Sequence, residues 1–100
     1  MKEKLAQKML EEKLDFLPLQ DSFKLKESGV HLETRFGWVL NIEEMPEGIS
    51  EKPLDEILEI VKDLYGDYYD NYLTIGDSYS AFDEFTLELC PAPTYIDLIR

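Results

Sequence analysis

The sequence predicts an α+β fold, with a single domain over residues 1–100 in which two helices pack on a mainly antiparallel sheet of about four to five strands. Two segments repeat apolar residues every three to four positions, which is typical of amphipathic helices. Other segments alternate apolar and polar residues, which is typical of half-buried strands. The expected order is α-β-β(β)-α-β-β, and 100 residues are enough for one core.

The first helix is expected over residues 2–17, where apolar residues recur at helical spacing. Pro18 ends it, because the residue before a proline is pushed out of the helical region. After a turn at residues 19–22, Phe23 and Leu25 alternate with lysines, and this alternation predicts a short strand.

The longest alternating run covers residues 30–42, with apolar residues and one threonine at the even positions. It exceeds the usual strand length of about 3–10 residues. Gly37 lies within it, where a bulge, bend or turn is most expected. We therefore expect either one long bent strand or two strands that meet at Gly37, followed by a loop over residues 44–48.

The second helix is expected to open at Ser50 or a neighbour and to end at Tyr65. Pro53 fits its first turn, because the missing N–H would be unpaired there in any case. Gly66 suits the position after the helix end. The apolar stripe of this helix consists of Leu54, Ile57, Leu58, Val61, Leu64 and Tyr65.

The last third of the chain has less regular patterns. Residues 67–72 combine three tyrosines with two aspartates, and they either extend the helix past a kink or form an ordered loop. Residues 73–75 predict a strand, with a turn at residues 76–78. Alternation predicts another strand over residues 85–89, and residues 95–99 predict a last short strand.

Composition excludes several kinds of site. The single cysteine, Cys90, excludes an internal disulfide and a multi-cysteine zinc site. The single histidine, His31, gives no support to a Ser–His or Cys–His nucleophile. No apolar run approaches the roughly 20 residues that a bilayer helix needs, and residues 1–5 do not resemble a signal peptide. We expect a cytoplasmic protein that is not an enzyme and has no cofactor.

The charge is strongly negative, at −12 from 22 acids and 10 bases. Residues 63–97 contain eight acids and no base. Carboxylates repel phosphates, so nucleic acid and membranes are not expected as direct partners. A basic protein is favoured, because an acidic surface accelerates its encounter and helps to exclude wrong partners.

The tyrosine- and acid-rich segment 65–84 is the predicted partner-binding site. Tyrosine is enriched at the energetic centres of interfaces, and carboxylates pair with lysine and arginine. The predicted binding residues are Asp67, Tyr68, Tyr69, Asp70, Tyr72, Asp77, Asp83 and Glu84. Alternatively, Tyr65, Tyr68 and Tyr72 continue the apolar stripe of the second helix into the core, which leaves Tyr69 off the stripe.

These patterns favour a small acidic binding protein that neutralises or regulates a basic protein. Immunity proteins of toxins and mimics of nucleic acid are of this kind, and the partner would be a toxin domain, such as a nuclease, or a nucleic-acid-binding protein. Two alternatives remain. The acids of residues 67–84 could bind Mg²⁺ or Ca²⁺ in an enzyme or regulator, or the tyrosines could be buried in a structural homodimer.

Overall fold

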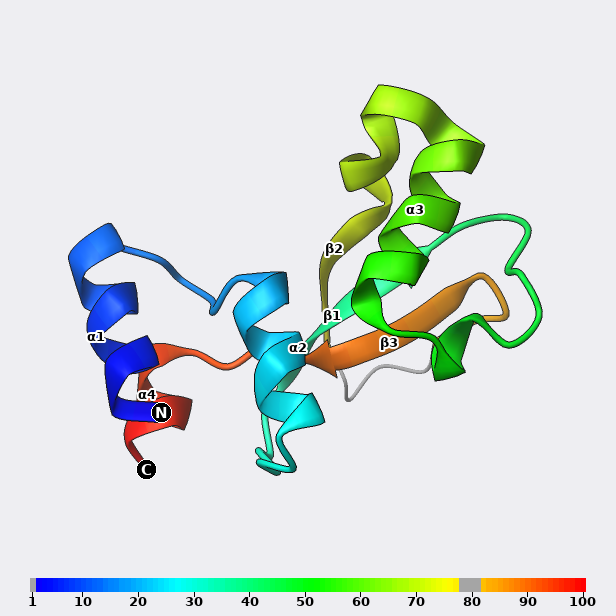
Figure 1. Ribbon diagram of the computed structural model, residues 1–100. Helices are drawn as coiled ribbons and strands as arrows, with labels where there is room; N and C mark the ends of the chain where they lie inside the picture. The colour runs from blue at the N-terminus through cyan, green and yellow to red at the C-terminus, as the bar shows by residue number, and fades with distance from the viewer. Residues whose placement is uncertain (1, 78–81) are drawn as a thin grey trace.

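A three-stranded antiparallel sheet, ordered β2-β1-β3, organises the computed structural model, which describes residues 2–77 and 82–100 (Figure 1). With the helices around it, the sheet gives the α+β class that the sequence predicts. The elements are α1 (Lys2–Glu12), α2 (Leu19–Glu27), β1 (Phe36–Asn41), the 3₁₀ helix η1 (Ile49–Glu51), α3 (Leu54–Tyr65), the 3₁₀ helix η2 (Gly66–Tyr72), β2 (Leu73–Asp77), β3 (Thr86–Pro91) and α4 (Tyr95–Ile99).

The central strand β1 pairs with both edge strands. Trp38 lies opposite Ile75 of β2, and Leu40 lies opposite Leu87 of β3. The β1–β3 register shifts between Trp38 and Val39, where β3 has one extra residue. This β-bulge lies one position beyond the glycine where the sequence predicts an irregularity.

Gly37 faces the flexible side chain of Glu88, an exposed residue of the neighbouring strand β3. A Cβ atom at Gly37 would lie 2.6 Å from the carboxylate Oε1 of Glu88.

The main hydrophobic cluster lies between α3 and the sheet. Ile57 and Val61 of α3 are buried together with Leu40 of β1 and Leu89 of β3. Burying an aliphatic side chain of this size contributes about 1.5–3 kcal/mol. The predicted apolar stripe of α3 therefore packs in or against this cluster, as its spacing indicates, and Leu64 is the exception.

A second cluster joins the two ends of the chain. Ala6 and Met9 of α1 pack with Leu17, Leu25 of α2 and Leu98 of α4. Figure 1 shows α1 and α4 together at one side of the molecule, with both chain ends on them.

Hydrogen bonds join this helical region, residues 2–35 and 94–100, to the sheet region, residues 36–93. The indole Nε1 of Trp38 donates to the Leu17 carbonyl at 2.8 Å, and the Leu17 N–H donates to the Pro93 carbonyl at 2.9 Å.

The predicted strand at Phe23 and Leu25 is wrong, because these residues belong to α2. Positions i and i+2 of a helix lie about 200° apart, so alternation places them on opposite sides of a helix as it does in a strand. Phe23 accordingly packs in the main cluster and Leu25 in the second cluster.

The predicted last strand, residues 95–99, is also wrong, because it forms α4. A capping box starts this helix: the Thr94 hydroxyl accepts from the Asp97 N–H, and the Asp97 carboxylate accepts from the Thr94 N–H at 2.9 Å. The structure thus has three strands within its described residues, and the predicted four to five strands and their order are not confirmed.

Several boundaries also differ from the predictions. Helix α3 begins at Leu54 after Pro53, and not near Ser50, which lies in the separate 3₁₀ helix η1.

Helix α1 ends at Glu12, and Lys13 takes a left-handed conformation with φ of 54°. Strand β1 begins at Phe36, while residues 30–35 before it form no regular element. The predicted turn at residues 76–78 is wrong at its first two positions, which lie in β2, and its third lies outside the described residues.

None of the helices in residues 2–77 and 82–100 combines the length and the apolar character that a membrane crossing requires.

Candidate protein-binding surface

The corner between α3 and η2 is built around Gly66. Its φ of 65° lies in the left-handed region that favours glycine, and its N–H donates to the Lys62 carbonyl, which ends α3. The chain then continues directly as η2 over residues 66–72, which agrees with the predicted extension of the helix past a kink. Figure 1 shows this corner at the top of the molecule, away from α1 and α4.

The 3₁₀ geometry decides which tyrosines pack inside. A 3₁₀ helix repeats every three residues, so Tyr69 and Tyr72 share one side. Both pack against the main cluster together with Tyr65, and the Tyr65 and Tyr72 rings stack with centroids 3.9 Å apart. The alternative with Tyr68 on the core stripe is therefore wrong for that residue, since Tyr69 takes its place.

Tyr68 instead faces solvent, with 73% of its surface exposed. Leu64, in the last turn of α3, is 50% exposed, although its spacing predicts a place on the core stripe. It lies near the helix end, two residues before Gly66, and this position is the sequence signal that could have identified it. Exposed aspartates accompany this pair: Asp63, Asp67 and Asp70. We call the five residues Asp63, Leu64, Asp67, Tyr68 and Asp70 the α3–η2 corner.

Asp77 lies away from this corner. The five residues of β2, at about 3.3 Å each, place it about 13 Å from the start of the strand at Leu73. Its Oδ2 atom lies 3.4 Å from Nη2 of Arg35, in an ion pair near the start of β1.

Asp83 and Glu84 lie in the turn before β3, on the other side of β1 from β2. The Asp83 Oδ1 atom accepts from the Phe85 N–H at 3.0 Å and from the Thr86 hydroxyl at 2.9 Å, so this carboxylate stabilises the turn. Of the eight predicted binding residues, the structure thus brings together the five on η2. Two of those five, Tyr69 and Tyr72, point to the core.

The net charge is distributed unequally over the structure. Residues 1–35 hold seven acids and seven bases, and residues 94–100 hold one of each. The whole net charge of −12 therefore belongs to residues 36–93, with 14 acids and two bases. Within them, α3 and η2 carry six acids and a single base, Lys62.

Among the described residues, the other side chains that could take part in catalysis or metal binding are not gathered into a site. Cys90 is buried, and burial raises the pKa of its thiol to about 12, so it stays protonated at neutral pH. His31 is exposed beside a shallow hollow of about 390 Å³. Across residues 2–77 and 82–100, no three His, Cys, Asp or Glu side chains are placed to share a metal ion.

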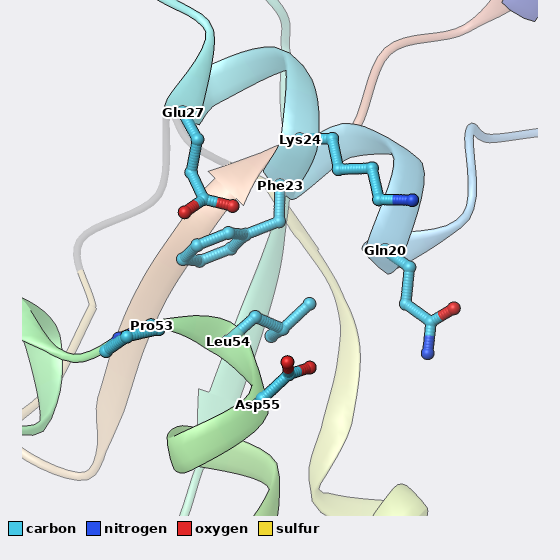
Figure 2. A pocket seen from close by; sticks show the side chains of 7 residues that line it. All are labelled: Gln20, Phe23, Lys24, Glu27, Pro53, Leu54 and Asp55. Atoms are coloured by element: carbon cyan, nitrogen blue, oxygen red, sulfur yellow. The ribbon is translucent and has the colours of Figure 1, made fainter.

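A second hollow, of about 370 Å³, lies between α2 and the start of α3. Its lining residues are Gln20, Phe23, Lys24, Glu27, Pro53, Leu54 and Asp55. Figure 2 shows the Phe23 ring near Leu54, with the carboxylates of Glu27 and Asp55 on opposite sides of these two apolar groups. Sequence reasoning missed this hollow because it placed Phe23 on a strand. Its single lysine and separated carboxylates form no acid–base or nucleophilic set.

Comparison with protein-family models, with curated protein sequences and with solved structures gave no match to this chain. The function is therefore inferred from its own residues.

Proposed function

We propose that this protein binds a basic protein through the α3–η2 corner and thereby neutralises or regulates it. The observation that carries the proposal is the exposure of Tyr68 and Leu64 among three exposed aspartates. Interfaces commonly have aromatic or apolar anchors at their centre and charged residues at the rim. The α3–η2 corner has this composition: its three exposed aspartates, which are all negative, accompany the apolar pair Tyr68 and Leu64.

The charge identifies the chemistry of the partner. Exposed carboxylates attract lysine and arginine side chains, and an aromatic ring adds a cation–π contribution of about 0.5–1 kcal/mol at an exposed site. On a protein that binds nucleic acid, the aspartates would occupy the places of phosphates. We therefore propose a toxin domain of the nuclease type, or another nucleic-acid-binding protein, as the partner.

Co-purification with matched baits tests this function. Immobilised wild-type protein should retain a basic protein at low salt. At physiological ionic strength, salt already screens the attraction between exposed charges beyond about 8 Å, so the attraction is stronger at lower salt. Asp67→Asn/Asp70→Asn should retain less of it. The control Glu12→Gln/Glu33→Gln removes two exposed acids from residues 1–35, where acids and bases are equal in number. This control should retain the same amount of the basic protein as the wild type.

Two results would count against the proposal. One is the recovery of no basic protein at either low or high salt. The other is equal loss with both double variants, because net charge alone would then explain the binding.

A further inference from the structure

Strand β2 differs from β3 in how its outer edge is protected. Main-chain groups at a sheet edge can pair with another chain, and natural proteins usually block them. On β3, the Lys26 ammonium donates to the Leu89 carbonyl at 2.7 Å, the Thr86 N–H donates to the Asp83 carbonyl, and Pro91 has no N–H. This edge also has the bulge described above, and α2 packs against it.

The hydrogen-bond alternation shows which groups of β2 face outward. The Ile42 N–H donates to the Phe85 carbonyl, and the Phe36 carbonyl accepts from the Ala92 N–H. Even-numbered residues of β1 thus direct their main chain toward β3, so odd-numbered ones bond to β2. Their partners on β2 are Gly76 and Thr74. Hence the N–H and C=O groups of Ile75 point to the outer edge.

These two groups of Ile75 have no partner among the residues that the structure describes. The neighbouring outward N–H, that of Leu73, already donates to the Asp70 carbonyl of η2. Within residues 2–77 and 82–100, no strand other than β1 pairs with β2. In an added antiparallel strand, one residue would lie directly opposite Ile75. The N–H of each residue would donate to the carbonyl of the other.

We propose that an extended segment of the basic partner pairs with the edge of β2 at Ile75. This inference rests on the proposed function, because it names the mode by which the same partner binds. Charge complementarity selects this occupant: η2 carries Asp67 and Asp70 and leads directly into β2, so a strand with lysine or arginine would have carboxylates beside its end. A second copy would bring another net charge of −12 to the same edge.

Proline at position 75 provides a selective test. Ile75→Pro removes the outward N–H and leaves the ladder bonds of Thr74 and Gly76 in place, and proline is tolerated on edge strands when its nitrogen faces away from the ladder. The matched control Ile75→Ala shortens the side chain and keeps the N–H. Circular dichroism of both variants checks that they fold.

The probe is a synthetic peptide of alternating lysine and valine, titrated into ¹⁵N-labelled protein. A second peptide of equal charge is N-methylated at both its valines and its lysines, so neither of its edges can donate main-chain hydrogen bonds. We expect the Ile75 amide signal to move most and its hydrogen exchange to slow about tenfold. Affinity should fall about fivefold in Ile75→Pro, and equally for the methylated peptide, but less than about twofold in Ile75→Ala.

Three results would overturn the proposal. If both peptides bind equally and shift only the signals of η2, charge recognition occurs without strand pairing; the proposed function then stands and this inference fails. If neither peptide binds while the co-purification still recovers a basic protein, the inference likewise fails alone. If light scattering shows a dimer that Ile75→Pro abolishes, a second copy occupies the edge instead.

Discussion

The sheet region and the helical region of this protein differ in both core and charge. Residues 36–93 form the sheet, α3 and η2 around the main cluster and carry the entire net charge, whereas α1, α2 and α4 belong to segments with balanced charge. Acids that served solubility alone would be useful on both regions. The excess of acids over bases is confined to residues 36–93, so the net acidity is a property of this region rather than of the whole chain.

Within the sheet region, the exposed α3–η2 corner also differs from the buried residues beneath it, which we call its support. Tyr65, Tyr69 and Tyr72 attach η2 to the main cluster, while Tyr68 and Leu64 remain exposed. Neighbouring residues thus differ in burial, so substitutions can distinguish effects on stability from effects on binding.

The largest expected effect is on the support. Ile57→Ala should lower the free energy of unfolding by about 2–5 kcal/mol, because Ile57 is 1% exposed and its truncation leaves a cavity under α3. Urea denaturation measures the loss. Leu64→Ala in the same helix is the control and should cost less than about 1 kcal/mol. Equal losses would mean that the corner is part of the core.

Tyr68→Ala should have the next largest effect, and on binding alone. We expect a loss of about 2 kcal/mol in affinity for the basic protein recovered by co-purification, since Tyr68 is the exposed aromatic anchor. The free energy of unfolding should change by less than about 0.5 kcal/mol. Calorimetric titration and urea denaturation give the two values, and unchanged affinity would remove Tyr68 from the interface.

In the helical region, Thr94→Ala should cost about 1 kcal/mol of stability, because it removes the hydroxyl that caps α4. Affinity for the same partner should stay at the wild-type value. Thermal unfolding and the binding titration test both statements. A variant that lost stability and affinity together would show that the two regions act as one unit in binding.

The last expected effect depends on pH and concerns Cys90, buried in the main cluster. Its thiol has a pKa of about 12 in the folded protein against an ordinary value of 9.0. Between these two pH values the unfolded chain has released a proton that the folded chain keeps. The contribution of the thiol to the free energy of unfolding is therefore fully present below about pH 9 and is lost as pH rises. The stability of the wild type should therefore fall relative to Cys90→Ala as pH rises from about 9 towards about 12. Parallel profiles would contradict the burial of the thiol.

Some of these features could be predicted from the sequence, and the reason differs by element. Helix α3 was predictable because six apolar residues follow one period between Pro53 and Gly66. The strand predicted at Phe23 and Leu25 failed because two alternating residues fit both periods when the two sides of a helix are buried. For α4, the Thr94–Asp97 spacing was a visible capping signal that outweighs a short apolar run.

The candidate site was predictable in its location and less so in its members. The acid- and tyrosine-rich segment indicated η2, but which tyrosine is exposed depends on the change from α to 3₁₀ geometry after Gly66. The positions of Asp77 and Asp83 depend on strand pairing, which local patterns do not contain.

The most direct test compares two charge reversals of equal size against the purified partner. Asp67→Lys/Asp70→Lys alters the α3–η2 corner, and Glu12→Lys/Glu33→Lys alters exposed acids of the helical region. Association rates over a range of ionic strength should fall steeply for the corner variant and stay near the wild-type value for the other. Equal reductions in both variants would contradict a localised binding surface.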